Sequence, residues 1–305
     1  MTLRVATCQF PVTADIRHNL RYISRQLREA RNRGARVAHF AEAALSGYAG
    51  VDFPSHDGFD WALLEESTRE VLELAGELGI WVLFGSAHRL TGGHKPHNSL
   101  YIVDDQGKLI DRYDKMFCAG SSSADDGDLE HYSSGDHFCV FTIDGVSCGV
   151  LICHDYRYPE LYREYKRLGV RLMFHSFHAG GLGAERFAAM RDYVGPELFT
   201  INPGSTLPGI TQPATMIAEA ACNHVWISCP NSSARESCWP TFFVRPDGVV
   251  TGRVRLHTAG VLISEVDPSL ELYDSTVAWR DRAMAGTFHS GPLVRDPRSD
   301  DRLAL

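Results

Sequence analysis

The chain has 305 residues, a length that fits one large domain or two small ones and allows a sizeable buried core. Hydrophobic residues make up 44% of the sequence and charged residues 22%, which excludes a disordered chain, a collagen and a coiled coil. Lys and Arg number 30 against 38 Asp and Glu, a net charge of −8, and no basic cluster opposes this balance. Nucleic acid is therefore not an expected partner.

No apolar run approaches the ~20 residues that a membrane span needs, so no membrane partner is expected. The segment from Met1 to Gln9 lacks the charged and long apolar regions of a signal peptide, which predicts a cytoplasmic protein. Most of the eight cysteines lie in apolar runs or unmatched loops, and no Cys-x-x-Cys occurs. Free thiols are expected rather than a disulfide framework.

The first half of the chain alternates between apolar strand-like runs and helical patterns. After Asp15, apolar side chains recur every three or four positions, which predicts a helix from Ile16 to about residue 30. A second helix is expected from Trp61 to Leu78. Strands are expected at 3–10, 36–41, 80–87, 99–104 and 108–113, the last two joined as a hairpin.

The second half repeats this order with a hairpin at its start. Asp144-Gly145 is a favoured hairpin turn, and Pro159 is typical of a helix start. The further elements are strands at 138–143, 146–152, 171–177, 225–229 and 259–266, a helix ending near Asn223, and a hairpin around 246–248. This alternation predicts mainly parallel pairing in two packed sheets with helices outside. Residues 1–267 are read as one domain, and 268–305 as an extension that orders by docking.

Three reactive residue types follow predicted strands. Glu42 follows the strand at 36–41, Lys115 the strand at 108–113, and Cys153 the strand at 146–152. Reactive groups gather beyond the carboxyl ends of parallel strands. A thiol nucleophile needs a base, and a nearby cation stabilises an oxyanion, so the three together indicate a nucleophilic site. Taken singly, each has a plainer explanation as a loop charge, an edge lysine or a packed cysteine.

Three ordered sequence blocks carry a family resemblance: Phe40-Ala-Glu-Ala-Ala-Leu-Ser-Gly-Tyr48, Tyr113-Asp-Lys-Met116, and Gly149-Val-Leu-Ile-Cys-His-Asp-Tyr-Arg-Tyr-Pro-Glu160. Together they resemble the nitrilase superfamily of carbon–nitrogen hydrolases over residues 3–267. The resemblance implies an α/β fold, a four-layer αββα sandwich of two mixed sheets with helices outside. It also implies a catalytic Glu-Lys-Cys triad, which falls on Glu42, Lys115 and Cys153.

The family also has a second catalytic glutamate before the cysteine, and Glu130 fits that slot. Asp125, Asp126 and Asp128 stand just before it, and the plainer explanation for Glu130 is a surface charge. Substrate-binding roles are expected for three further residues, Tyr48, His154 and His178. His175 and His178 are spaced like metal ligands, but strand alternation places them on opposite faces, so neither a metal nor an organic cofactor is expected.

Cys153 is followed by His154 and Asp155, a pattern that resembles amidase and carbamoylase members rather than nitrile-cleaving ones. The resemblance therefore implies hydrolysis of a non-peptide linear amide or N-carbamoyl C–N bond through a cysteine thioester. Nitrile hydrolysis by the same triad and a non-catalytic binding protein on this scaffold are the alternatives. Leu151 and Asp155 flank the cysteine where a glutamine amidotransferase has glycines, which argues against that class.

The resemblance also implies a homodimer or higher homo-oligomer, built across the helix after Pro159. That helix carries an apolar stripe with Tyr162 and Tyr165, and tyrosine is enriched at interface cores. The extension from Pro268 is expected to lie on the partner subunit.

Overall fold

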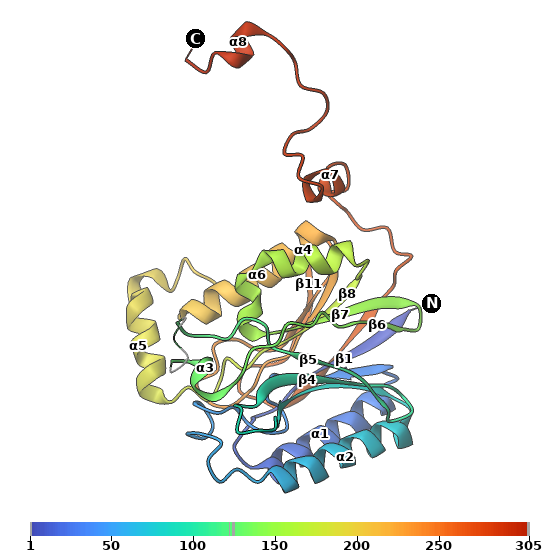
Figure 1. Ribbon diagram of the computed structural model, residues 1–305, viewed down its shortest axis with the longest axis vertical. Coiled ribbons are helices and arrows are strands. Elements are labelled where there is room, and N and C mark those ends of the chain that lie inside the picture. Colours follow the sequence, from blue (N-terminus) through green and yellow to red (C-terminus); the bar gives the residue numbers. More distant parts are fainter. Residues whose placement is uncertain (1, 122, 124–125, 304–305) are drawn as a thin grey trace.

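The computed structural model describes residues 2–121, 123 and 126–303, and it is a four-layer sandwich (Figure 1). One six-stranded sheet has the order β12-β1-β2-β3-β4-β5, and the other has the order β11-β10-β9-β8-β7-β6. Helices α1 and α2 cover the outer face of the first sheet, and α4 and α6 cover that of the second. The expected αββα architecture of two mixed sheets is confirmed.

The elements of the first half begin and end close to their expected positions. They are β1 (Leu3–Gln9), α1 (Ile16–Asn32), β2 (Val37–His39), α2 (Trp61–Leu78), β3 (Trp81–His88), β4 (His97–Val103) and β5 (Leu109–Asp114). The Asp15 side chain accepts a hydrogen bond from the His18 amide at 3.0 Å, which fixes the start of α1. Gly79 ends α2 in the left-handed conformation that glycine adopts without strain.

The second half departs from expectation in two places. Its elements are α3 (Asp128–His131), β6 (Val140–Ile143), β7 (Val146–Ile152), a 3-10 turn (Cys153–Arg157), α4 (Pro159–Arg167), β8 (Leu172–Ser176), α5 (Ala184–Val194), a 3-10 turn (Pro196–Leu198), α6 (Leu207–Asn223), β9 (Trp226–Cys229), β10 (Phe242–Val244), β11 (Val250–Arg253), β12 (Gly260–Val266), α7 (Arg280–Met284) and α8 (Pro297–Asp300). Two helices, α5 and α6, stand where one was expected. The last strand, β12, returns to the first sheet and pairs antiparallel with β1.

The expectation of mainly parallel pairing is wrong outside the sheet centres. Strands β1, β2 and β3 pair in parallel, as do β7, β8 and β9. The flanking strands are antiparallel. Short turns join β4 to β5, β6 to β7 and β10 to β11, which favours this pairing, whereas longer segments connect the other antiparallel neighbours. The carboxyl ends of the parallel strands of both sheets carry the candidate site.

The main hydrophobic core lies between the two sheets and under α4 and α6. Leu83 and Leu100 of the first sheet and Val150 and Phe174 of the second belong to it, and all four are fully buried. A second core lies between the first sheet and helices α1 and α2. All eight cysteines are free, as the apolar runs around them predicted. No helix in the described part of the chain is both long enough and apolar enough to span a membrane.

A buried histidine links the two sheets close to the candidate site. His39 contacts the hydroxyls of Ser228 and Ser176, each at 2.9 Å, one through each ring nitrogen. The Ser176 hydroxyl in turn donates to the Phe40 carbonyl at 2.9 Å. Burial lowers the pKa of His39 well below its ordinary value, so the ring is neutral. This network holds the end of β2, three residues before Glu42.

The aromatic stripe of α4 is not an open interface, contrary to the expectation from its spacing. The Tyr165 hydroxyl donates to the Val150 carbonyl at 2.7 Å, and that of Tyr162 contacts His175 Nδ1 at 2.6 Å. Both rings are buried within their own subunit. A period of three to four residues shows which helix face is apolar, but not whether its own sheet or a partner covers it.

The C-terminal extension lies partly on its own subunit. The Thr276 hydroxyl donates to the Cys222 carbonyl at 3.3 Å, and Arg167 donates to the Met284 carbonyl at 2.7 Å. These contacts fix the first part of the extension against the ends of α6 and α4. Beyond α7 the chain runs away from the body (Figure 1).

Candidate active site

The structure brings together the three residues that follow the predicted strands. Lys115 Nζ donates to Glu42 Oε1 at 2.8 Å, and both side chains are completely buried. Cys153 opens the turn after β7 and lines a cavity of ≈ 480 Å³. Asp128, whose carboxylate accepts a hydrogen bond from Lys115 at 2.7 Å, lines the same cavity, so the three groups belong to one site.

Close backbone packing fixes Glu42. Its amide donates to the Phe177 carbonyl of the opposite sheet at 3.3 Å. The turn also lies so close to β3 that a Cβ at Gly85 would stand 2.3 Å from the Ala43 nitrogen, so glycine is required there. Asn98 Nδ2 donates to Glu42 Oε1 at 2.8 Å. Oε1 is thus held by two donors, whereas the buried Oε2 has no hydrogen-bond partner among the described residues and is open to a proton.

Lys115 is shared by two carboxylates. Besides Glu42, its ammonium donates to Asp128 Oδ2 at 2.7 Å. Burial disfavours the charge, but the carboxylates of Asp128 and Glu42 outweigh it and raise the pKa of Lys115 well above its ordinary value. Lys115 is therefore a fixed cation at the base of the site.

Asp128, rather than Glu130, is the second acidic residue that contacts Lys115. The Tyr48 hydroxyl and the Ala119 amide also donate to the Asp128 carboxylate, the latter at 2.8 Å. Burial would raise the pKa of Asp128, but the neighbouring Lys115 charge holds it below its usual value. The Glu130 side chain is 60% exposed and lies 3.8 Å from His131 at the cavity rim.

The sequence already showed that another acidic residue could contact Lys115, since Asp128 stands two residues before Glu130. In the four-residue helix α3, a shift of two positions points a side chain to another face. Of the other two aspartates before Glu130, Asp126 lines the cavity rim, and Asp125 lies outside the described residues.

Cys153 stands in a strained turn that its neighbours hold in place. Its φ of 40° is in the left-handed region, which non-glycine residues rarely adopt. Asp155 fixes the turn: its Oδ2 accepts hydrogen bonds from the Ile152 amide at 3.0 Å and the Tyr113 hydroxyl at 2.8 Å. Burial, and next the Glu42 charge, raise the pKa of Cys153 well above its ordinary value. The resting residue is therefore a thiol that needs a base in order to attack.

Gln212, which contacts Cys153, and Trp239, which contacts Gln212, were not found from the sequence as site residues. Gln212 Nε2, on α6, donates to Cys153 Sγ at 3.9 Å, and Trp239 Nε1 donates to Gln212 Oε1 at 2.6 Å. An indole nitrogen only donates, so the amide oxygen must face Trp239 and the amide NH₂ must face the sulfur. No local pattern in the sequence marks Gln212, because it lies 59 positions from Cys153.

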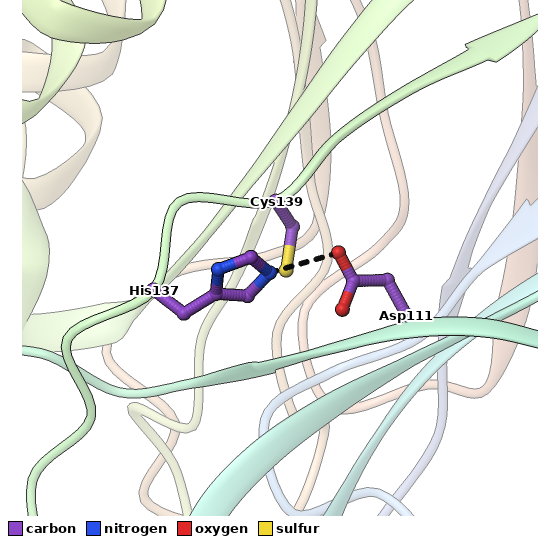
Figure 2. Close-up of side chains that lie close together, drawn as sticks. All are labelled: Asp111, His137 and Cys139. Atoms are coloured by element: carbon purple, nitrogen blue, oxygen red, sulfur yellow. Dashed lines mark hydrogen bonds and ion pairs between the residues drawn. The ribbon is translucent and has the colours of Figure 1, made fainter.

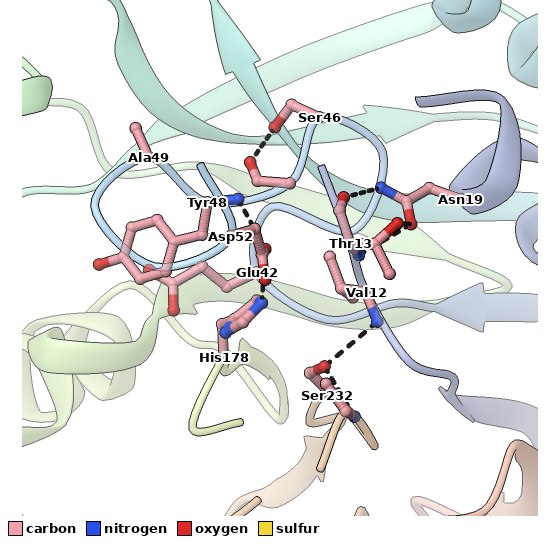
Figure 3. A network of polar contacts seen from close by, with 12 residues as sticks. Val12, Thr13, Asn19, Glu42, Ser46, Tyr48, Ala49, Asp52, His178 and Ser232 are labelled. Atoms are coloured by element: carbon pink, nitrogen blue, oxygen red, sulfur yellow. Dashed lines mark hydrogen bonds and ion pairs between the residues drawn. The ribbon is translucent and has the colours of Figure 1, made fainter. Parts of the chain in front are cut away.

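The three expected substrate-binding residues line the same cavity as Cys153. Tyr48 and His178 lie with Glu42 and Asp52 in one polar network (Figure 3). His178 Nε2 lies 3.0 Å from Asp52 Oδ2. Burial opposes the charge on His178, but Asp52 raises its pKa above the ordinary value. Burial lowers the pKa of His154, so the cavity wall has one histidine that favours its charged form and one that favours its neutral form.

The chain belongs to the carbon–nitrogen hydrolase family, whose model matches residues 4–273. Among curated relatives, the omega-amidase NIT2 of Xenopus tropicalis is 27% identical over 175 residues, which cover 56% of this chain and 62% of that protein. The omega-amidase NIT2 of Bos taurus is 28% identical over 181 residues, which cover 57% of this chain and 63% of that protein. The chain thus matches less than two thirds of the length of these relatives.

Solved structures agree with the fold. An amidase from Nesterenkonia sp. superposes with a TM-score of 0.67 at 19% identity, covering 87% of this chain and 90% of that one. A mutant of this amidase, with a TM-score of 0.67 and 19% identity over 87% of this chain and 90% of that one, carries the acetamide moiety of fluoroacetamide on its active-site cysteine. At this identity the likeness establishes the sandwich fold.

A matched pair of substitutions distinguishes the two acidic candidates. Asp128→Asn removes one negative partner that holds the fully buried Lys115 ammonium in place. If Lys115 is the oxyanion donor, misplacing it should cost as much as losing it, so we expect kcat/KM to fall at least ~100-fold. Glu130→Gln changes an exposed rim residue, and we expect a near-normal rate. Initial rates of ammonia release, with circular dichroism to check the fold, measure both. A larger loss in Glu130→Gln than in Asp128→Asn would contradict the assignment.

Proposed function

We propose that the chain hydrolyses a non-peptide linear amide or N-carbamoyl C–N bond through a cysteine thioester. The observation that carries this proposal is the buried Glu42–Lys115 pair beside Cys153, with one Glu42 oxygen open to a proton. Membership of the carbon–nitrogen hydrolase family and the likeness to amidases support it. The roles of Glu42, Lys115 and Cys153, and of Asp128 beside them, belong to the same proposal.

In the first half of the reaction, Glu42 Oε2 accepts the thiol proton as Cys153 Sγ attacks the substrate carbonyl carbon. The C=O bond becomes an oxyanion, which the Lys115 ammonium and the backbone N–H of His154 stabilise. The oxyanion then collapses and the C–N bond breaks. Glu42 passes its proton to the leaving nitrogen, so ammonia or an amine departs and a thioester remains.

In the second half, water attacks the thioester carbonyl while Glu42 accepts a water proton. The same cation stabilises the second oxyanion, and the C–S bond then breaks. The Glu42 proton returns to the sulfur, and the acid product leaves. Glu42 thus serves as base and acid in turn, which requires its free oxygen to face both the thiol and the substrate.

Two alternatives stay beside this proposal. Nitrile hydrolysis would use the same three residues, but Cys153-His154-Asp155 resembles the amide-cleaving pattern. A binding protein without activity would not need a buried ammonium between two carboxylates. Burying an ammonium and two carboxylates costs desolvation free energy, and apolar residues of similar volume often stabilise a fold as well or better.

A substrate panel tests the proposed reaction. The purified chain should release ammonia from small amides or N-carbamoyl compounds and not from nitriles. Cys153→Ala should abolish release, because no thioester forms, whereas Cys222→Ser, at an exposed thiol, should retain full activity. Mass spectrometry of the quenched wild-type reaction should show acylation of Cys153. Release from nitriles alone supports the first alternative, and no release from any compound supports the second.

A double-mutant cycle tests whether Trp239 orients Gln212 toward the nucleophile. Gln212→Leu removes the donor at Cys153 Sγ. Trp239→Phe removes the indole N–H that holds the Gln212 oxygen, so the Gln212 side-chain amide can rotate. We expect each to lower kcat/KM by about tenfold, the upper range for one hydrogen bond. Because both act through one contact, the double variant should also lose about tenfold. Additive losses in the double variant would show that Trp239 contributes only packing.

We also propose a homodimer or higher homo-oligomer in which the extension, from residue 268 onward, lies on a partner subunit. Past α7 the chain runs away from the body and presents Phe288, Leu293 and Val294, which are 87%, 73% and 75% exposed. Grouped apolar side chains of this kind favour contact with another surface. The boundary at residue 267 between the hydrolase domain and the C-terminal extension stays a prediction, as does the cytoplasmic location.

Sedimentation of the purified chain at micromolar concentration tests this assembly. We expect a species of at least two chains, and a chain ending at residue 284 should shift toward a single-chain mass, because it keeps the contacts to its own subunit but loses the exposed segment. A wild-type species of 33.9 kDa would contradict the proposal.

A further inference from the structure

A second cluster of reactive side chains lies outside the candidate active site. It consists of Asp111 on β5 and of His137 and Cys139, which precede β6 (Figure 2). Their ligand atoms all lie within 4.8 Å of one another, and His137 Nε2 is 2.9 Å from Asp111 Oδ2. None of the three lines the cavity at Cys153. It is the one group of this kind in the part of the chain that the structure describes.

The cluster joins the two sheets. Strands β5 and β6 are the outermost strands of their sheets, and both lie on the edge away from the pair β11 and β12. Asp111 stands 26 residues before His137 in the sequence. No ligand-like spacing therefore appears in the chain, and only the packing of the two sheets brings the carboxylate to the His-x-Cys segment.

The donor set has the chemistry of a zinc site. An imidazole nitrogen, a thiolate sulfur and a carboxylate oxygen are the three ligand types that zinc prefers, and tetrahedral bonds of about 2.0–2.3 Å place ligand atoms roughly 3.3–3.8 Å apart. In the cluster, His137 Nε2 and Asp111 Oδ2 are 2.9 Å apart and no two ligand atoms are more than 4.8 Å apart, so a small outward shift of the His137 ring would admit the ion. Asp111 Oδ1 already accepts from the Arg112 amide at 2.8 Å, which orients Oδ2 toward the cluster.

Charge and access also fit a cation. The neighbouring Arg112 guanidinium pairs with Asp114 at 2.8 Å and contacts His88, so it does not occupy the Asp111 carboxylate. The His137 side chain is 55% exposed, which gives an ion and a fourth, water ligand a path from solvent. Cys139 is fully buried and closes the inner side.

We propose that Asp111, His137 and Cys139 form a binding site for a divalent ion of the zinc class, which clips the edge strands of the two sheets together. On binding, the Cys139 thiol gives up its proton to solvent and its sulfur bonds the metal. Neutral His137 binds through Nε2 with its one ring proton on Nδ1, so the metal replaces the His137–Asp111 hydrogen bond. The site would be structural, and its ligands take no part in the chemical steps of the proposed hydrolase reaction. The clip would stabilise the folded state, because the unfolded chain does not hold the three ligands together.

Cobalt(II) is the probe for this site, because a thiolate ligand gives it a charge-transfer band in the near ultraviolet. The titration uses the full chain with Cys153→Ala, which removes the candidate nucleophile as a competing thiol. We expect one cobalt per chain and a thiolate band. Cys139→Ser in this background should lose the band. His137→Gln should weaken cobalt binding at least about tenfold, the lower end of what even an outer-shell change costs.

Cys222→Ser in the same background is the matched thiol control and should leave the band unchanged. His137 is exposed, so His137→Gln tests the site even if Cys139→Ser fails to fold. Zinc should also raise the melting temperature of the Cys153→Ala chain and not that of the His137→Gln double variant. The absence of a band, or a band that survives His137→Gln at unchanged affinity, would overturn the proposal and leave a His–Asp ion pair beside a buried thiol.

Discussion

The candidate site depends on one completely buried ammonium. Lys115 has no exposed side-chain surface, and it contacts Glu42, Asp128 and the Tyr48 hydroxyl. Removing one partner of a buried ion pair typically costs about 3–5 kcal/mol, because the remaining charge has no water to solvate it. The end of β2, the end of β5 and the short helix α3 are therefore tied to one another by charge, and not by apolar packing alone.

The charge balance of this cluster explains the state of the nucleophile. Two carboxylates surround one ammonium, so the site carries an excess of negative charge next to Cys153. Burial and this negative charge both oppose a thiolate, which is why the pKa of Cys153 is raised. In the proposed reaction, proton transfer and attack on the carbonyl are therefore best coupled, since the charge formed at sulfur would move at once to an oxyanion near Lys115.

The sequence was informative where a residue's position follows from local rules. Glu42, Lys115 and Cys153 each follow a predicted strand, which marks them as candidates, and the three sequence blocks that resemble the nitrilase superfamily group them as one triad. Caps such as Asp15 gave the helix starts. These features depend on periodicity and on neighbours a few residues away.

The sequence was uninformative where long-range packing decides. Asp128 reaches Lys115 because the loop before α3 folds back so tightly that a Cβ at Gly127 would lie 2.3 Å from the Ala119 carbonyl oxygen. The sequence shows several acidic residues in this segment, but no pattern in it gives the fold-back that brings Asp128, and not Glu130, to Lys115. Gln212 was missed because α6 approaches the nucleophile only through the fold.

Lys115 follows an edge strand, which has a hydrogen-bonded neighbour strand on one side and is therefore less rigid than a central strand. Strand β5 is an edge strand that pairs with β4, yet in the proposed reaction Lys115 stabilises an oxyanion, and such a residue must be held to a fraction of an ångström. The second sheet provides the missing support. Tyr113, two residues before Lys115, donates to Asp155, two residues after Cys153, and the Phe117 amide donates to the same carboxylate at 2.9 Å.

Asp155 therefore connects strand β5, which leads to Lys115, with the turn that contains Cys153. Burial raises its pKa to about 6, and the hydrogen bonds that it accepts limit that rise. This gives a physical reason for an aspartate two positions after the nucleophile, whatever the substrate. The contact between Asp111 and His137 supports β5 again, closer to the start of the strand. Strand β5 is thus held to the opposite sheet at two points. These contacts fix the position of Lys115 more firmly than backbone hydrogen bonds to β4 alone would.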